Sequence, residues 1–575
     1  MAIHNEDIAR IFDELADLLE IDEANPFRVR AYRNAARTVR ALGRDLGEMV
    51  AGGEDLTRLP AIGKDLAAKI EEILQTGTCK ALEKLHGHLP PSLESLLALP
   101  GLGPKRVKTL YRELGIRDPE ALEKAAREGR LESLPGFGPK TRQRILEAIA
   151  AQRTTERRFL LSVARQYAEP LVTWLRASSA VAAVEIAGSY RRGKETVGDL
   201  DILVTTGKPD AVMRRFSTYE EVEDVLSRGS TRATVILRCG LQVDLRVVDT
   251  SCLGAALQYF TGSKAHNIQV RRLAQQRRLK INEYGVFRGE RRIAGDTEPS
   301  VYRAVGLPWI PPELREGRGE IEAAQAGRLP HLIGLGDLQG DLHVHTRASD
   351  GHDTLEAMAL AARAAGLKYI AITEHSRRLA VAKGLDEERL EQHLKAIDAL
   401  NSRLRGITLL KGIEVDILED GRLDLPDRVL AHLDLVVGAV HSHFGLSRRK
   451  QTRRILRAMD HPYFTILAHP GGRLLLEREA CDVDMEQIIK GAAERGCFLE
   501  INAQPQRLDL DAVFSRMCRD AGVLLAINSD SHSREQYANL RYGIEQARRG
   551  WLEKDDVLNT RNLKEVRILI EKTMG

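Results

Sequence analysis

The 575-residue chain lacks the features that mark secreted and membrane proteins. It has only six cysteines and no CxxC pair, which argues against a disulfide-stapled secreted scaffold and is typical of a reducing cytosol. No apolar run approaches the roughly 18 residues that a membrane span needs. The N-terminus reads as an acidic amphipathic helix rather than a signal peptide. Because the chain is too long for one hydrophobic core, we expect a multidomain, cytoplasmic globular protein.

A strong excess of charge is also missing, since 86 Lys and Arg against 82 Asp and Glu leave a net charge of only +4. That total alone does not indicate a polyanionic partner. The charges are unevenly spread, however, and residues 101–200 contain 19 basic and 12 acidic side chains. Of the 16 histidines, only four precede residue 320. The sequence therefore pairs a mildly basic first half with a second half rich in metal-ligand residue types.

Hydrophobic periodicity divides the chain into regions of different structure. Residues 1–150 follow the 3.6-residue period of helices, whereas short apolar strands begin near residue 181. Residues 311–340 are rich in Pro, Gly and charge and are typical of a linker. After residue 340, apolar strands alternate with amphipathic helices, which favours a parallel β/α barrel or an open α/β sheet.

One motif occurs three times in the helical region, at 56–70, 96–110 and 131–145. Each copy has Leu-Pro, a glycine-containing turn, a nearby lysine and a new helix, so that free N–H groups could hold a phosphate without reading a base. A single copy would be an ordinary helical turn, but three copies resemble helix-hairpin-helix motifs that grip a DNA backbone. The residues expected to contact DNA here are Gly63, Lys64, Gly101, Gly103, Lys105, Gly136, Gly138 and Lys140.

Residues 187–204, AGSYRRGKETVGDLDILV, carry the strongest signal of the first half. Asp199 and Asp201 are two positions apart on a predicted strand, so both carboxylates face the same side. Asp244 lies on another apolar strand, and three converging carboxylates suit two Mg²⁺ or Mn²⁺ ions. Upstream, Gly188-Ser189 forms a tight turn with a hydroxyl, and Arg192 offers a forked donor for phosphate.

With the motifs YFTGS (259–263) and INEY (281–284), residues 1–317 resemble a family X DNA polymerase of the polymerase beta type. The resemblance implies that Asp199, Asp201 and Asp244 bind the catalytic metals and that Asp244 acts near the primer 3′-hydroxyl. Lys264 stands where the family has an acid, and Gln242 replaces a family arginine. Together with Lys264, the residues implied to bind the dNTP or the nascent base pair are Gly188, Ser189, Arg192, Tyr259, Phe260, Gly262, Asn267 and Arg271.

Residues 1–85 resemble the small lyase domain of the same family. The resemblance places Lys69 where the family forms a Schiff base with 5′-deoxyribose phosphate. Thr78 and Ala81 occupy two positions where the family has lysines, which leaves lyase activity open. The residues expected to bind a 5′-phosphate in a gap are Arg28, Arg33 and Lys64.

Metal-ligand residue types follow one predicted strand after another in the second half. His343 and His345 form an H-x-H pair whose rings project to one side of an extended strand. Because strand ends converge on one face of a β/α barrel, the later residues should meet this pair in a site suited to Zn²⁺ or Mn²⁺. The later residues are Asp350, His375, Glu414, His441, His469, Asp530 and His532.

This pattern resembles the polymerase and histidinol phosphatase (PHP) family over residues 337–575. The resemblance implies a seven-stranded barrel whose nine ligands bind three metal ions that activate water against a phosphoester. His352, His443, Arg473 and Asn502 are expected as further neighbours of the site.

The order of the two parts resembles bacterial PolX enzymes, and we expect multidomain α+β and α/β architecture. The implied function is gap-filling repair synthesis on gapped or nicked DNA with dNTPs, by a monomer that associates with the nucleoid. The PHP part would be a 3′–5′ exonuclease that also processes 3′ ends or cuts abasic sites. The alternatives are a small-molecule phosphatase tethered to DNA and a non-catalytic DNA-binding scaffold. The expected domains are a lyase-like DNA-binding domain (1–85), a helix-hairpin-helix DNA-binding domain corresponding to fingers or thumb (86–150), a nucleotidyltransferase palm (151–250), a subdomain that binds the dNTP and nascent pair (251–317), a linker (318–336) and a PHP domain (337–575).

Overall fold

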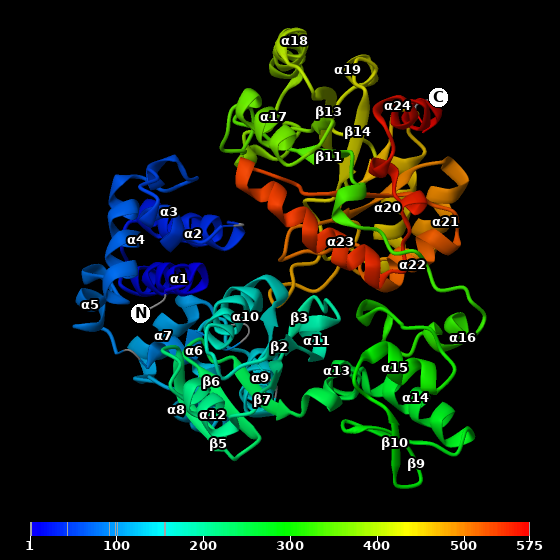
Figure 1. The fold of residues 1–575 in the computed structure, drawn as a ribbon. Coiled ribbons are helices and arrows are strands. Elements are labelled where there is room, and N and C mark those ends of the chain that lie inside the picture. The colour runs from blue at the N-terminus through cyan, green and yellow to red at the C-terminus, as the bar shows by residue number, and fades with distance from the viewer. Residues whose placement is uncertain are drawn as a thin grey trace. The chain divides into compact units, whose positions relative to one another are not determined.

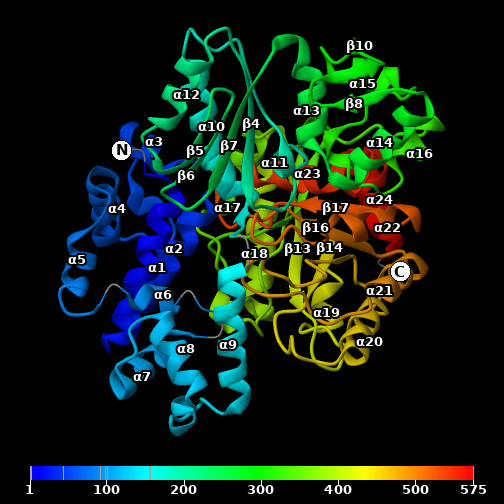
Figure 2. The ribbon, with the colours of Figure 1, turned by 90° about the horizontal axis from the view of Figure 1, so that it is seen from below.

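The computed structural model describes residues 3–42, 44–90, 92–97, 99, 102–154 and 157–573. The chain forms two compact units, Met1–Arg157 and Arg158–Gly575, which are described separately below. Figures 1 and 2 trace their elements from two directions. Along the described ranges, no helix is long and apolar enough to cross a membrane.

The first unit is helical around its own apolar core. In α1 (Asn5–Ile21), Ile8, Phe12 and Leu15 recur at helical spacing and are buried against α2 (Pro26–Ala41). The expected helical character of this region is confirmed. The remaining α-helices are α3 (Leu46–Ala51), α4 (Lys64–Thr76), α5 (Lys80–His86), α6 (Leu93–Leu97), α7 (Pro104–Leu114), α8 (Pro119–Arg127) and α9 (Pro139–Thr154).

The second unit begins with a five-stranded palm sheet of order β2-β4-β7-β6-β5. The central strands β4 (Asp199–Thr205) and β7 (Gln242–Val248) run parallel, and their apolar side chains pack with α10 (Leu161–Arg176) and α12 (Pro209–Ser217). The outer strands are β2 (Ala183–Ile186), β6 (Arg232–Leu237) and β5 (Val222–Arg228). This sheet matches the strands expected from the sequence, apart from β5, whose side chains are almost all exposed.

The subdomain that follows the palm, called the thumb below, has a separate small core. It contains α13 (Leu253–Thr261), α14 (Lys264–Gln276), α15 (Glu298–Ala304) and an antiparallel sheet of β8 (Lys280–Asn282), β9 (Gly285–Arg288) and β10 (Arg291–Ala294). Residues 318–336, predicted as a linker, include α16 (Glu320–Gln325). Its Ile321 and Ala324 are buried in the thumb core, so this segment is packed structure.

The last part is a parallel sheet whose seven strands follow one another in chain order. A bridge between Val344 and Ser531 brings the first and last strands together, so that the sheet is nearly closed, as the expected barrel requires. Its strands are β11 (Gly340–Val344), β12 (Tyr369–Ile372), β13 (Thr408–Asp416), β14 (Leu435–Ala439), β15 (Ile466–Leu467), β16 (Phe498–Asn502) and β17 (Leu525–Asn528). The surrounding helices are α17 (Leu355–Ala364), α18 (Glu387–Arg403), α19 (Asp427–Leu430), α20 (Arg448–Met459), α21 (Met485–Arg495), α22 (Ala512–Asp520), α23 (Leu540–Arg549) and α24 (Leu563–Thr573).

The palm and the barrel pack against each other within this second unit. Leu508 and Tyr542 of the barrel belong to the palm's apolar core. At the edge of that contact, Arg165 Nη2 of α10 donates to Glu545 of α23 at 2.7 Å. The two parts are therefore joined by apolar packing as well as by ion pairs.

Candidate active sites

Strand register brings the three predicted aspartates together in the palm. Asp199 and Asp201 project from the same face of β4, and Asp201 is the direct register partner of Asp244 on β7. Because β4 and β7 run parallel, these side chains lie on one side of the sheet.

The aspartates have different electrostatic environments. Burial raises the pKa of Asp201 to about 7, and the charges of Asp199 and Asp244 add to this effect. Burial also opposes ionisation of Asp244, but hydrogen bonds outweigh it and hold the pKa of Asp244 below its usual value. The donors are Thr234 Oγ1 at 2.6 Å, Gln242 Nε2 at 2.9 Å and Arg232 Nη2 at 3.2 Å. Mutual repulsion within this carboxylate set suits neutralisation by bound cations.

The turn before β4 needs glycine at position 188. Gly188 has φ +62°, and a Cβ there would lie 2.5 Å from the Asp201 carboxylate. The turn leads into α11 (Gly188–Arg191), which carries Ser189. Arg192 follows it and donates to Glu316 of the thumb at 3.0 Å. The Arg192 guanidinium, which we expected to bind the dNTP phosphates, is therefore paired with Glu316.

Arg191 joins the same turn to the thumb through a buried ion pair. Its two terminal nitrogens donate to Glu298 at 2.8 and 2.7 Å, and Arg315 Nη1 donates to Glu298 at 2.6 Å. Burial opposes the charge of Glu298, but the two arginines outweigh it and lower its pKa to about 2. Sequence reasoning missed Glu298 and Glu316, because nothing in their local sequence marks them as partners of the palm.

The residues expected around the nucleotide are on α13 and α14. Asn267 Nδ2 donates to the Tyr259 carbonyl at 2.7 Å, and the Arg271 guanidinium lies 5.1 Å from the centroid of the Tyr259 ring. Phe260 lies under the guanidinium of Arg246, 4.5 Å from its ring centroid. Gly262 and Lys264 form the junction between the two helices, where Gly262 has φ +66°.

The hairpin glycines precede helices in the first unit. Gly63 and Gly103 are the N-caps of α4 and α7, and Gly138 comes directly before α9. A Cβ at any of the three, or at Gly136, would meet nothing within 4 Å, so these turns border open space. Lys64 begins α4, and Lys105 and Lys140 are the second residues of α7 and α9. Gly101 lies outside the described residues.

Two of the residues expected to contact a 5′-deoxyribose phosphate, Lys69 and Arg33, are held in ion pairs. Lys69 Nζ donates to Asp65 at 2.5 Å, one helical turn earlier on α4. Arg33 donates to Asp17 at 2.7 Å and to Glu20 at 2.8 Å, whereas Arg28 is exposed on α2. Lys69 and Arg33 would have to exchange these partners before they contacted a 5′-deoxyribose phosphate.

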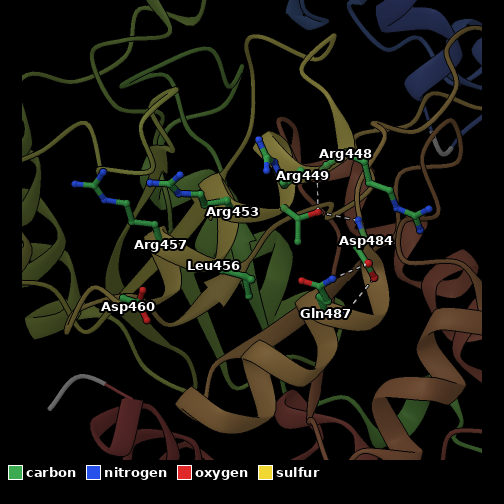
Figure 3. A pocket seen from close by; sticks show the side chains of 9 residues that line it. Arg448, Arg449, Arg453, Leu456, Arg457, Asp460, Asp484 and Gln487 are labelled. Carbon is green, nitrogen blue, oxygen red and sulfur yellow. Dashed lines mark hydrogen bonds between the residues drawn. The ribbon is translucent and has the colours of Figure 1, made fainter.

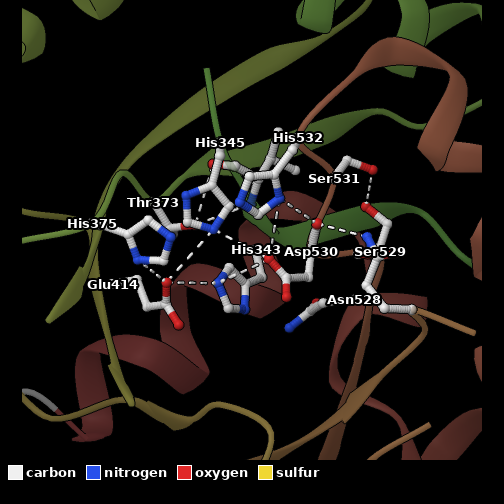
Figure 4. A network of polar contacts seen from close by, with 12 residues as sticks. His343, His345, Thr373, His375, Glu414, Asn528, Ser529, Asp530, Ser531 and His532 are labelled. Carbon is white, nitrogen blue, oxygen red and sulfur yellow. Dashed lines mark hydrogen bonds and ion pairs between the residues drawn. The ribbon is translucent and has the colours of Figure 1, made fainter. Parts of the chain in front are cut away.

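The barrel brings the nine predicted metal ligands together at and beyond the carboxyl ends of its strands. Figure 4 shows part of this group, with His343, His345, His375, Glu414, Asp530 and His532 labelled. Most of these residues fall into three groups, and within each group the potential ligand atoms lie within 4.8 Å of one another. His345 and His375 each belong to two of the groups. His469 contacts the cluster through Glu414, with its Nε2 3.1 Å from that carboxylate. The three groups are His345, Asp350, His375 and His532; His343, His345 and Asp530; and His375, Glu414 and His441.

Several polar atoms of this cluster have no hydrogen bond to any described residue, although they are buried. They include Nε2 of His343 and both ring nitrogens of His345. Buried polar groups are ordinarily hydrogen-bonded, so unpaired ring nitrogens beside carboxylates fit metal coordination. The donor set therefore suits Zn²⁺ or Mn²⁺.

Protonation in this cluster follows the local charges. Burial opposes charge on His375, but Glu414 and Asp350 outweigh it and raise its pKa to about 10. By contrast, burial and the charges of His532 and His375 lower the pKa of His345 to about 4. Neighbouring imidazoles of the cluster thus have pKa values shifted in opposite directions by the charges around them.

A surrounding layer orients the ligands. Glu500 accepts from His343 Nδ1 and from the backbone N–H of His469, both at 2.8 Å, and Asp416 lies 3.2 Å from His441 Nδ1. These contacts leave the Nε2 atoms of His343 and His441 for a metal. Sequence reasoning missed both acids, although Glu500 in FLEIN is an unusual charge within an apolar strand.

The four further neighbours have different surroundings. Asn502 donates to Asp530 at 3.0 Å, and the His352 backbone N–H donates to the His532 carbonyl at 2.7 Å. His443 is exposed. The Arg473 guanidinium donates to Glu195 of the palm at 2.8 Å and to the carbonyls of Arg507 and Leu508. Arg473 therefore joins the barrel to the palm.

Family models match along the chain in the order expected. A helix-hairpin-helix domain matches residues 3–79 and a SAM-like helix-hairpin-helix tandem matches 93–151. The DNA polymerase beta palm matches 165–255, the DNA polymerase beta thumb 256–316 and the PHP domain 341–504.

A relative with the same complete arrangement decides the family. The DNA polymerase/3′-5′ exonuclease PolX of Bacillus subtilis (strain 168) is 38% identical over 577 residues, which cover 99% of this chain and 100% of that protein. This chain belongs to the PolX family. It is a DNA polymerase of family X with a C-terminal PHP domain, and both parts belong to metal-dependent enzymes.

Other similarities cover parts of this PolX chain. A protein of Thermoanaerobacter sp. (strain X514) described as a probable phosphatase is 29% identical over 38% of this chain and 89% of its own length. A crystal structure of Leishmania infantum polymerase beta, a ternary P/T complex, is 20% identical and covers 39% of this chain and 98% of that chain. Its TM-score of 0.27 is too low to support an argument.

Proposed function

We propose that this PolX chain fills short gaps in DNA at the palm and removes nucleotides from 3′ ends at the barrel. The observation that carries the proposal is the presence of two separate metal-type clusters in one chain. One is the carboxylate set of Asp199, Asp201 and Asp244, and the other is the histidine-rich group at the barrel's strand ends. The substrates would be gapped or nicked duplex DNA and dNTPs.

In the palm, Asp199, Asp201 and Asp244 would hold two Mg²⁺ or Mn²⁺ ions. Such ions neutralise phosphate oxygens and favour the ionised 3′-hydroxyl of a primer. The Asp244 carboxylate is kept ionised by Thr234 and Gln242, which suits a role beside that hydroxyl. Ser189 and Arg192 would bind the β- and γ-phosphates, once Arg192 leaves Glu316.

Around the base pair, Tyr259, Phe260 and Gly262 would line the sugar pocket, and Asn267 and Arg271 would approach the minor groove. Lys264, at the first turn of α14, would add a cation beside the nucleotide. The hairpin turns at Gly63, Gly103 and Gly138 would hold the DNA backbone on either side of the gap.

In the barrel, the nine ligands would hold three Zn²⁺ or Mn²⁺ ions. These ions activate water and neutralise the charge of a phosphoester. Glu500 and Asp416 fix the imidazoles of His343 and His441, so that the ligands are oriented before substrate arrives. Processing of blocked 3′ ends and incision at abasic sites would use the same chemistry.

A second candidate for the barrel is a small-molecule phosphatase, which the similarity to the Thermoanaerobacter protein favours. The full-length similarity to a polymerase with exonuclease activity favours DNA as the substrate instead. A non-catalytic scaffold has no need for two buried metal-type clusters. Lyase activity through Lys69, a monomeric state and association with the nucleoid are further parts of the proposal.

The test uses a 5′-labelled primer on a duplex with a one-nucleotide gap. We expect Asp199→Ala to abolish extension and leave degradation, whereas His343→Ala should do the reverse. Matched controls are Asp224→Ala, an exposed carboxylate of the same palm sheet, and His432→Ala, an exposed histidine of the barrel. Either assignment fails if its variant retains the activity assigned to it. Release of phosphate from small phosphomonoesters without degradation of DNA would instead support the phosphatase.

A further inference from the structure

Helix α20 presents a row of arginines on the outside of the barrel. Arg449, Arg453 and Arg457 recur every four residues on one exposed face, and Arg448 and Lys450 are exposed beside them. Like charges at this spacing destabilise a helix. Among the described residues, no carboxylate pairs with Arg448, Arg449 or Arg453.

These arginines line a groove of about 580 Å³ between α20 and α21 (Figure 3). The groove also contains two acids, Asp484 and Asp460, and both already have partners. The Asp484 carboxylate caps α21 by accepting from the Gln487 backbone at 3.2 Å and from Gln487 Nε2 at 2.9 Å. Asp460 accepts from Arg495 Nε at 2.7 Å. The groove therefore offers unpaired cations, whereas its acids are occupied.

A buried arginine fixes α20 to the loops that carry the metal cluster. Arg454 is 2% exposed, and its Nε and Nη1 donate to the carbonyls of Leu418 and Ser442, both at 2.8 Å. Ser442 follows the ligand His441, and Arg448 follows His441 by seven positions. The N-terminal end of the arginine row thus begins at the rim of the barrel where the ligands converge.

We propose that this groove binds the sugar–phosphate backbone of the DNA strand whose 3′ end enters the histidine cluster. The inference rests on the exonuclease function proposed above. From Arg449 to Arg457 the helix rises through eight residue steps, which extend about 12 Å along its axis. A strand of duplex DNA carries one phosphate per about 3.4 Å of axis, so the row spans roughly three phosphates.

The chemistry of the groove favours a polynucleotide over other anions. Arginine forks match phosphate oxygens in a bidentate manner, and several in a row need several linked phosphates. A mononucleotide would meet only one or two of these cations. Leu456 in the groove offers an apolar contact for a sugar face.

The experiment compares a long and a short DNA substrate, of which only the long one can extend from the histidine cluster along α20. We would measure kcat/KM for 3′-end hydrolysis of a single-stranded 20-mer and of a dinucleotide, which is too short to extend from the cluster along α20. The variant is Arg449→Gln with Arg453→Gln, where glutamine is a good helix former. The matched control is Arg403→Gln with Arg567→Gln, which removes two exposed arginines from α18 and α24.

We expect the ratio of kcat/KM for the 20-mer to that for the dinucleotide to fall about tenfold in the groove variant only. The slope of log kcat/KM for the 20-mer against log salt should also become shallower, by about 1.4 for two lost phosphate contacts. An unchanged ratio and slope in the groove variant, or an equal fall of the ratio in the control variant, would overturn the inference.

The result that would refute the proposed exonuclease function differs from the result that would refute DNA binding in the groove. A wild-type protein that hydrolyses neither DNA substrate would refute the exonuclease itself. A wild-type protein that hydrolyses both substrates with equal kcat/KM would refute only the binding of DNA in the groove.

Discussion

At the level of single residues, the carboxylate charges of the two clusters are stabilised by different kinds of side chain. In the palm, Asp244 is kept ionised by neutral and cationic donors, chiefly Thr234 and Gln242. In the barrel, the charge of Glu414 is held by histidines instead, with His375 Nδ1 at 2.6 Å and His441 Nε2 at 3.2 Å. The palm cluster therefore carries excess negative charge, whereas the barrel cluster is partly balanced by its own ligands.

The ion pair at Glu298 predicts a pH-dependent contribution to stability. Its pKa of about 2 lies below the ordinary value of 4.5, so the contribution is complete above pH 4.5 and is lost as the pH falls through 2. We expect Glu298→Gln to lower the free energy of unfolding of the second unit by about 3 kcal/mol at pH 7. Urea unfolding at pH 7 and pH 3 would measure the free energy of unfolding of both proteins. The difference in this free energy between Glu298→Gln and wild type should be smaller at pH 3 than at pH 7. Glu290→Gln, an exposed thumb carboxylate, is the control; a difference from wild type that grows in acid would contradict this account.

At the scale of elements, sequence patterns located the strands that carry the proposed catalytic residues. The alternation in DLDILV and the H-x-H pair predicted which side chains share a face, because a strand has a fixed period of two. Strand β5 was missed since its side chains are exposed and charged, and β8 to β10 are too short to show a period. Partners such as Thr234 and Glu500 depend on register between strands, which one sequence does not encode locally.

Glu500 of strand β16 orients the His343 imidazole, and we predict the effect of replacing this acid. Glu500 accepts from His343 Nδ1 at 2.8 Å, so Glu500→Gln should weaken metal binding at the barrel by about 10- to 100-fold and leave extension unchanged. Metal content after dialysis, measured by mass spectrometry, would show fewer ions per chain. Glu391→Gln, on an exposed face of α18, should keep the wild-type content. Equal metal content in wild type and Glu500→Gln would count against the assigned role.

On the scale of the molecule, the palm and barrel are joined by residues that are close in sequence to residues of both candidate sites. Glu195, three residues after Arg192, accepts from Arg473 at 2.8 Å and from Gln546 at 2.7 Å. Burial opposes the charge of Glu195, but Arg473 and Arg549 outweigh it and lower its pKa. Arg473 is also four residues after His469, one of the predicted metal ligands. The order of domains was predictable from sequence motifs, but this contact was not, because it joins loops 278 positions apart.

The central claim, that one chain inserts and removes nucleotides at separate centres, is tested most directly by idling turnover. Wild-type protein is incubated with a one-nucleotide gap and only the complementary labelled dNTP, and release of labelled dNMP is followed. We predict many dNMP released per gap for wild type, a single stable insertion without dNMP for His343→Ala, and neither product for Asp199→Ala. Sustained release of dNMP by His343→Ala would contradict the account.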